Sequence, residues 1–222
     1  MNTPTIGKMH EPLNLYHGSD KIIEKPKYGF GNKYNDYGLG FYTTPSFELA
    51  AEWAVPTANT DGYVNAYHLS IEEIKILDMD NEPFEHWISI LIQNRGGRFS
   101  RAVRDRKKRW LDMFPFSADN YDVIKGWRAD DSYFSFVRDF FDGGLSLENL
   151  NKAMKFGDFG TQYCVVSEKA FDLLEFIEPA EPIKADVYYY KRETRDKLAR
   201  KSYENMENMG RGTILYDIVG RD

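Results

Sequence analysis

The segments with strand character in this chain are short, and helical segments separate them irregularly. Each is a run of apolar, β-branched or aromatic residues bounded by glycine, proline or polar residues. They are Leu13–His17, Phe41–Thr43, Val64–Leu69, Tyr121–Trp127, Tyr163–Val166 and Leu174–Ile177. Strands occur before and after mixed helices, without the regular alternation of a βαβ protein. This order favours an α+β fold over a doubly wound parallel sheet.

Helical periodicity is clearest in the segment that follows Thr44. Apolar residues recur there on one face, at Phe47, Ala50, Ala51 and Ala54. Thr44 is predicted to be the N-cap of this helix, with Pro45 at its first position. The other predicted helices are Phe84–Ile92, Asp131–Phe141, Leu147–Phe156, Ala170–Leu174 and a charged helix within residues 191–209. Thr213–Val219 is predicted to be a terminal strand.

The composition is that of a chain with its own core. The length of 222 residues predicts one domain, and 42% hydrophobic residues suffice for a core. Aromatic residues make up 15%, which leaves open whether the rings form core or a stacking surface. The net charge of −6 disfavours a generally basic nucleic-acid binder. With no apolar segment of signal-peptide or transmembrane length, we expect a cytoplasmic protein without membrane association.

Metal and disulfide chemistry have little support. The chain has one cysteine, Cys164, so an internal disulfide and a cysteine zinc cluster are excluded. His10, His17, His68 and His86 show no ligand spacing, and we therefore expect no metal site.

Two short motifs place hydrogen-bonding or aromatic side chains beside glycines at strand ends. The first is Leu15-Tyr16-His17-Gly18-Ser19, and the second is Gly38-Leu39-Gly40-Phe41-Tyr42-Thr43-Thr44. A Gly- and Tyr-rich loop from Lys27 to Gly40 leads into the second motif and is too long for a simple turn. The arrangement suits a flat, charged ring held against bare backbone.

With the Ala- and aromatic-rich helix that follows, these motifs resemble the ADP-ribosyltransferases of the His-Tyr-Glu type. The nearest likeness is to a bacterial branch long catalogued as a domain of unknown function and associated with toxin–antitoxin loci. The resemblance runs from about Leu13 to about Glu178. It implies a split β-sheet core with a nucleotide cleft and NAD as co-substrate. We expect this domain at residues 12–182, with a basic insertion at about 98–118, and an appendage at 183–222.

The resemblance also assigns roles to residues of the two motifs. His17 would hydrogen-bond a ribose hydroxyl, and Gly18 would let the backbone approach the nicotinamide carboxamide. Tyr42 would lie against nicotinamide, where cation–π attraction contributes roughly 0.5–2 kcal/mol. Trp53 matches the place of a second stacking aromatic, although ordinary packing explains it equally well. The remaining candidates for the cofactor site are the motif neighbours Ser19 and Thr43.

The third motif departs from the family pattern. Gln162 occupies the position of the family glutamate, which bonds the ribose 2′-hydroxyl and stabilises the developing cation. Losing such a contact typically costs about 3–4 kcal/mol. In a second register Cys164 would replace the glutamate, but an inert buried thiol is preferred for that residue. Asp130 or Asp131 could supply the missing carboxylate, and Asp130 could equally cap the helix that follows.

A basic segment interrupts the otherwise acidic chain and contains aromatic residues. Its cations at positions 101–109 are Arg101, Arg104, Arg106, Lys107, Lys108 and Arg109. They could bind the phosphates of a nucleic acid or an acidic partner such as an antitoxin, or simply form a solvated helix face.

The resemblance therefore implies an NAD-dependent mono-ADP-ribosyltransferase, the toxin of a toxin–antitoxin or defence system, that modifies a protein or nucleic acid. Two alternatives share the cleft. One is an NAD glycohydrolase, and the other is a degenerate module that binds NAD, ADP-ribose or a protein partner without turnover.

Overall fold

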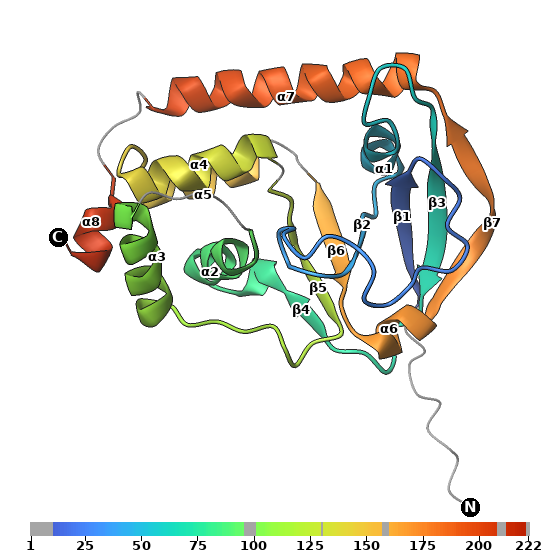
Figure 1. Cartoon of the computed structure of the whole chain (residues 1–222), viewed down its shortest axis with the longest axis horizontal. Helices are drawn as coiled ribbons and strands as arrows, with labels where there is room; N and C mark the ends of the chain where they lie inside the picture. Colours follow the sequence, from blue (N-terminus) through green and yellow to red (C-terminus); the bar gives the residue numbers. More distant parts are fainter. Residues whose placement is uncertain (1–10, 96–100, 130, 157–159, 208–211, 221–222) are drawn as a thin grey trace, which may run out of the picture.

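The strands that the structure describes form two sheets in this computed structural model (Figure 1). The described residues are 11–95, 101–129, 131–156, 160–207 and 212–220. The first sheet has the order β1-β3-β7, with antiparallel neighbours throughout. Its strands are β1 (Leu13–Ser19), β3 (Gly62–Leu69) and β7 (Leu174–Ile183).

The second sheet has the order β2-β6-β5-β4. Its strands are β2 (Phe41–Thr43), β6 (Thr161–Val165), β5 (Val123–Trp127) and β4 (Ile76–Asp78). β4 and β5 run parallel, whereas β2–β6 and β5–β6 are antiparallel. An isolated bridge joins the two sheets, because Tyr16 and Thr44 exchange backbone hydrogen bonds of 2.8 and 2.9 Å. This bridge brings β1 and β2, the strands of the two glycine motifs, side by side.

Each face of the second sheet packs against a different partner. Leu77, Ile124 and Cys164 belong to the core that the sheet shares with a group of helices. Phe41, Val123 and Val165 point the other way and pack with residues of the first sheet, Leu15, Tyr67 and Leu69. The alternation follows from the two-residue period of a strand.

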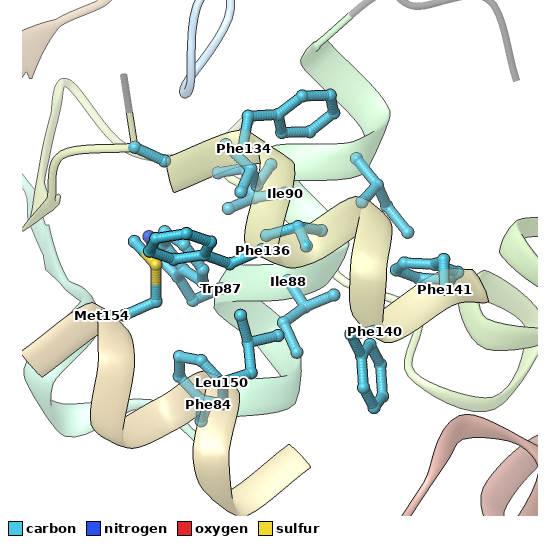
Figure 2. Packing of buried hydrophobic residues seen from close by; sticks show 14 of the residues in the cluster. Phe84, Trp87, Ile88, Ile90, Phe134, Phe136, Phe140, Phe141, Leu150 and Met154 are labelled. Atoms are coloured by element: carbon cyan, nitrogen blue, oxygen red, sulfur yellow. The ribbon is translucent and has the colours of Figure 1, made fainter. Parts of the chain in front are cut away.

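Helices with large aromatic side chains cover the first of these faces. They are α2 (Phe84–Asn94), α3 (Arg101–Met113), α4 (Asp131–Asp142), α5 (Leu147–Phe156) and α8 (Leu215–Val219), with a short 3-10 helix η1 (Met79–Asn81) before them. Figure 2 shows aromatic side chains of α2 and α4 packing with Leu150 and Met154 of α5. Trp87 and Trp110 are fully buried. Much of the aromatic content therefore builds the core.

The remaining helices lie on or near the first sheet. α1 (Phe47–Ala54) packs on β1 and β3 through Ala50, Ala51 and Ala54, all fully buried as the helical period predicts. α6 (Glu168–Asp172) joins β6 to β7, and α7 (Ala185–Glu207) crosses over α1 and reaches α5 (Figure 1). Within the described residues, no helix has both the length and the apolar character needed to cross a membrane.

The predicted start of α1 is wrong by two residues. Thr44 is not the N-cap, because its backbone is bound to Tyr16 in the bridge between the sheets. Ser46 caps the helix instead, and its Oγ accepts a hydrogen bond of 3.2 Å from the Leu49 N–H.

The predicted strand at Thr213–Val219 is also wrong. Residues 215–219 form the short helix α8, and the Asp217 carboxylate accepts a hydrogen bond of 3.3 Å from the Ile214 N–H at its start. The backbone of Thr213 instead accepts a hydrogen bond from the Leu147 N–H, at the start of α5.

Gly18→Ala should destabilise the fold, because α1 lies directly against this position. A Cβ at Gly18 would overlap the Ala50 carbonyl oxygen and the Ala54 nitrogen, which are backbone atoms of a packed helix. Overpacking of this kind typically costs about 1–3 kcal/mol. Chemical denaturation of Gly18→Ala and of Gly144→Ala compares the two, since a Cβ at Gly144 would meet its nearest atom at 3.5 Å. Equal stability of both variants would contradict this account of the α1 packing.

Candidate functional site

A cavity of about 550 Å³ lies at the junction of β1 and β2. Residues of the long loop before β2, of α1, β6 and α7, and of the chain near the ends of α2 and β5 complete its walls. The lining residues are His17, Ile23, Pro26, Lys27, Phe30, Gly31, Asn32, Asn35, Asp36, Gly40, Phe41, Tyr42, Trp53, Arg95, Arg128, Gln162, Arg192 and Asp196. The volume is within the range of roughly 300–1,000 Å³ that is typical of small-molecule sites.

The geometry around His17 fixes which of its ring nitrogens is free for a ligand. Nδ1 lies 2.7 Å from the carbonyl oxygen of Tyr42, which can only accept, so Nδ1 carries the proton. Burial lowers the pKa of His17, and the bond to Tyr42 opposes part of that shift. The ring is therefore neutral at pH 7, and Nε2 is an acceptor for a ligand hydroxyl. The ring also lies against Phe41, with centroids 4.4 Å apart.

Tyr42 is held in place through its hydroxyl group. The hydroxyl donates a hydrogen bond of 2.8 Å to the Gly38 carbonyl and accepts one of 3.0 Å from the Tyr37 N–H. Gly38 has a φ of +79°, a left-handed conformation that favours glycine. Burial raises the pKa of Tyr42 well above its usual value, so the phenol stays protonated. The ring of Tyr42 is thus positioned in the cavity wall by its own loop.

Gln162 faces a buried carboxylate, Asp36. Its Nε2 donates to Asp36 Oδ2 at 2.9 Å and to the Trp127 carbonyl oxygen at 3.2 Å. Both partners are acceptors, so the amide must present its nitrogen to them, and Oε1 is the atom of Gln162 that can accept a hydrogen bond. The side chain is therefore fixed by Asp36 and offers a ligand an acceptor rather than a charge.

Asp36 is also the partner of Arg95, the C-cap residue directly after α2. Arg95 Nε lies 2.6 Å from Asp36 Oδ1, and the Ala129 N–H donates to Asp36 Oδ2 at 2.8 Å. Burial raises the pKa of Asp36, while Arg95, the Ala129 N–H and Gln162 oppose part of the rise. The carboxylate thereby ties the loop before β2 to α2, to the segment after β5 and to β6.

Asp36 was not predicted from the sequence to be a site residue. The signal that could have found it is the length of the loop from Lys27 to Gly40, which marks a functional connection without saying which side chain matters. The sequence instead suggested Asp130 or Asp131 as the source of the missing carboxylate. The structure does not test this role, because Asp130 lies outside the described residues. Asp131 begins α4, and its side chain is outside the described part.

Trp53 lines the cavity and carries a cation over its ring. The guanidinium of Arg128 lies 5.1 Å from the centroid of the indole. The indole Nε1 is buried and has no hydrogen-bond partner among the described residues. Trp53 is therefore part of the cavity wall, and one face of its ring is already occupied by Arg128.

Three predicted cofactor residues lie outside the lining of the cavity. Gly18 has its packing role against α1, and the Ser19 hydroxyl lies 3.4 Å from the Asp20 carboxylate at the exposed end of β1. Thr43 is fully buried, and its hydroxyl donates to the Tyr163 carbonyl at 3.1 Å. The structure gives Gly18 and Thr43 a packing function and leaves Ser19 at the surface.

Cys164 is a buried thiol, as expected. It is fully buried in the core, and burial raises its pKa to about 12. Such a thiol is a poor nucleophile. Gln162 lines the cavity, and Cys164 is not among the lining residues. The register that places Gln162 at the glutamate position stays a prediction.

The basic segment forms α3, and part of it supports the core. Trp110 is fully buried and donates to Ser89 Oγ at 3.1 Å, so its ring is not a stacking surface. Arg106 donates to the Phe141 carbonyl at 2.9 Å and lies 4.6 Å from the centroid of the Tyr216 ring. This arginine fastens α3 to α4 and α8. Nucleic-acid binding by the other cations of α3 stays a prediction.

The comparisons with known proteins yield one match. Residues 13–176 match the model of a family described as protein of unknown function, DUF3990. This segment contains His17, Asp36, Tyr42, Trp53 and Gln162, and it ends before α7 begins. No curated protein and no solved structure matches the chain. Since the match covers well over half of the sequence, the chain belongs to the DUF3990 family.

Proposed function

We propose that this protein is an NAD-dependent mono-ADP-ribosyltransferase that acts in the cavity between β1 and β2. One observation carries the proposal: His17, Tyr42 and Gln162, three residues of motifs far apart in the sequence, line the same cavity. His17 and Tyr42 are positions at which the sequence resembles the His-Tyr-Glu transferases, and Gln162 occupies the position of their glutamate. The α+β architecture with two sheets is compatible with the split core of that fold.

The chemistry requires a clamp on the nicotinamide end and support for the ribose. In the reaction the bond between the nicotinamide nitrogen and ribose C1′ breaks, and its electron pair returns to the ring, which leaves neutral. The acceptor atom then bonds to C1′ and releases its proton. The ring of Tyr42 would lie against the cationic nicotinamide, while His17 Nε2 and Gln162 Oε1 would accept hydrogen bonds from ribose hydroxyls.

The charge distribution of the cavity suits an anionic nucleotide. The described lining includes four basic residues, Lys27, Arg95, Arg128 and Arg192, against two acidic ones, Asp36 and Asp196. Because Arg95 neutralises Asp36 at 2.6 Å, that carboxylate gives little net charge to an oxocarbenium-like ribose. We therefore expect slow, single transfers rather than chain elongation.

A second candidate function is binding of NAD or ADP-ribose without turnover. The observation that favours it is the state of Gln162, whose amide nitrogen is committed to Asp36 and Trp127 while its Oε1 carries no charge. NAD hydrolysis with water as the acceptor would use the same cavity. The three functions differ in their products, which makes them separable.

The test is a product analysis with labelled NAD. Purified full-length protein is incubated with NAD labelled in the adenosine moiety and a cell lysate, and label is counted in protein, RNA, DNA and small-molecule fractions. We expect label in one macromolecular fraction, which identifies the class of the acceptor as protein, RNA or DNA. Tyr42→Ala and His17→Ala should abolish this signal.

Matched variants separate loss of chemistry from loss of fold. Tyr190→Ala removes an exposed tyrosine of α7 outside the cavity lining and should keep the signal. Tyr42→Phe keeps the ring that would contact nicotinamide and should retain part of it. Free ADP-ribose as the only labelled product would indicate the hydrolase. Binding of NAD without release of nicotinamide would indicate the binding module. Unchanged turnover in Tyr42→Ala would refute the assignment of the site.

We also propose, from the resemblance, that the chain is the toxin of a toxin–antitoxin or defence pair. Growth arrest on expression of the protein is the readout for this role.

A further inference from the structure

The C-terminal helix α7 contributes to the cavity although it lies beyond the segment that matches the family. The matched segment ends at residue 176, and α7 spans Ala185–Glu207. Two of its side chains, Arg192 and Asp196, are part of the cavity wall. The predicted appendage at 183–222 therefore supplies residues to the site.

Contacts on both sides of Arg192 hold this part of α7 against α1. Lys191 pairs with Glu48 at 2.8 Å, and Arg195 pairs with Glu52 at 2.8 Å. Ala185 packs in the same cluster as the buried alanines of α1. Because Glu52 directly precedes Trp53 in the sequence, these contacts place Arg192 near the Trp53 end of the cavity.

Hydrogen-bond donors gather at this end, although the wall also includes the carboxylate of Asp196. The guanidinium of Arg128 lies over the Trp53 ring at 5.1 Å, and Trp53 Nε1 is a buried donor without a hydrogen-bond partner among the described residues. A buried N–H that lacks a partner requires an explanation, and an acceptor atom of a bound molecule would supply one. Arg192 adds a second guanidinium from another element.

We infer that Arg192, Arg128 and Trp53 Nε1 bind the diphosphate of NAD, so that α7 completes the nucleotide site. The inference rests on the proposed function, because it assigns a part of the same cavity. Arginine is suited to this role, since its planar guanidinium donates two parallel hydrogen bonds to phosphate oxygens. Binding there would orient the ribose toward His17 and Gln162. Asp196 limits the positive charge of the wall and lies 3.7 Å from Arg195.

Calorimetric titration of the full chain with NAD, ADP and adenosine tests the assignment. Arg192→Ala should raise the Kd for NAD and for ADP about tenfold or more, as expected for a lost charge-assisted hydrogen bond. It should leave the Kd for adenosine, which has no phosphate, unchanged. Lys197→Ala is the matched control, because it removes a cation from the same helix outside the cavity lining. All three Kd values should stay at wild type in this variant.

The outcomes separate this inference from the proposed function. If the wild type binds none of the three compounds, the proposed function fails and the diphosphate site with it. If the wild type binds NAD and Arg192→Ala binds it equally well, only the diphosphate site is refuted. An equal loss of adenosine affinity would also refute it, since that would indicate a displaced helix. Should Arg192→Ala fail to fold, Arg192→Lys keeps the charge but not the planar pair of donors, and a smaller loss for NAD and ADP is expected.

Discussion

Asp36→Ala is expected to lower the free energy of unfolding by about 3–5 kcal/mol, because it removes the carboxylate from a buried ion pair with the Arg95 guanidinium. Only 13% of the Arg95 side chain and 5% of the Asp36 side chain are exposed. The substitution also removes the acceptor of the Ala129 N–H and one of the two acceptors of Gln162 Nε2, which keeps the Trp127 carbonyl. Chemical denaturation followed by tryptophan fluorescence measures the loss.

Two further variants locate the cause of this loss. Glu193→Ala breaks the exposed pair of Glu193 with Lys197, which is 3.6 Å long, and should change stability by about 0–1 kcal/mol. Adding Arg95→Met to Asp36→Ala should recover part of the lost stability, because the double variant no longer buries the Arg95 charge that paired with Asp36. A loss in Asp36→Ala no greater than that in Glu193→Ala would show that the buried pair does not hold the loop.

Asp36 also shows why part of the site was not predictable from the sequence. Its partners Arg95, Ala129 and Gln162 are 59, 93 and 126 positions away. No local period or spacing reports contacts of this range, and an aspartate in a Gly- and Tyr-rich loop suggests a turn residue as readily as a buried ion pair. The length of the loop was the available signal. It indicated that the loop has a function but did not indicate which of its residues is important.

The secondary structure was more accessible, because most of it depends on local patterns. The alanine face of α1 and the alternating pattern of β3 follow from helical and strand periods, and both lie where they were predicted. The errors occurred where a tertiary contact decides. Thr44 has the composition of an N-cap but is bound to Tyr16 across the two sheets. Thr213–Val219 has β-type composition, but the backbone and hydroxyl of Thr213 are bound to the start of α5, and residues 215–219 form α8.

Gly18 shows that a motif can predict a glycine without predicting its role. The motif predicted that Gly18 lets the backbone approach a ligand, whereas the fold requires this glycine for the close packing of α1 on β1. A sequence motif indicates that a position needs glycine. It does not indicate whether a ligand or a packed helix leaves no room for a side chain there. The position of His17 and Tyr42 in one cavity was predictable because a resemblance, not a local pattern, linked the two motifs.

Gln162→Glu, which restores the residue of the family pattern, is expected to destabilise this protein at neutral pH. The new carboxylate would lie about as close to Asp36 Oδ2 as Gln162 Nε2 does now, at 2.9 Å, and both side chains are buried. Two carboxylates at this distance share one proton, so the pKa of the pair is raised in the folded state above its value in the unfolded chain. We expect a loss of about 3–5 kcal/mol at pH 8, as for an unpaired buried charge.

The pH dependence of that loss identifies its origin. A raised pKa in the folded state means that the folded protein binds the proton more tightly, so its contribution to stability is present at low pH and disappears as the pH rises through the folded pKa. The stability difference between Gln162→Glu and the wild type should therefore be smaller at pH 5 than at pH 8 in urea denaturation. A difference that does not depend on pH would show that the two carboxylates do not interact.

The double variant Asp36→Asn with Gln162→Glu places a single negative charge at the family position. The new amide at position 36 can donate a hydrogen bond to the new carboxylate at position 162. Its nitrogen cannot then accept from the Ala129 N–H, so the recovery of stability at pH 8 should be partial. If the proposed function is correct, this variant should release nicotinamide from NAD up to about a hundredfold faster than the wild type, because a carboxylate then faces the developing ribose cation. Asp36→Asn alone supplies no charge at residue 162 and should give no such gain. Equal rates for the double and single variants would mean that the missing glutamate does not limit turnover in this cavity.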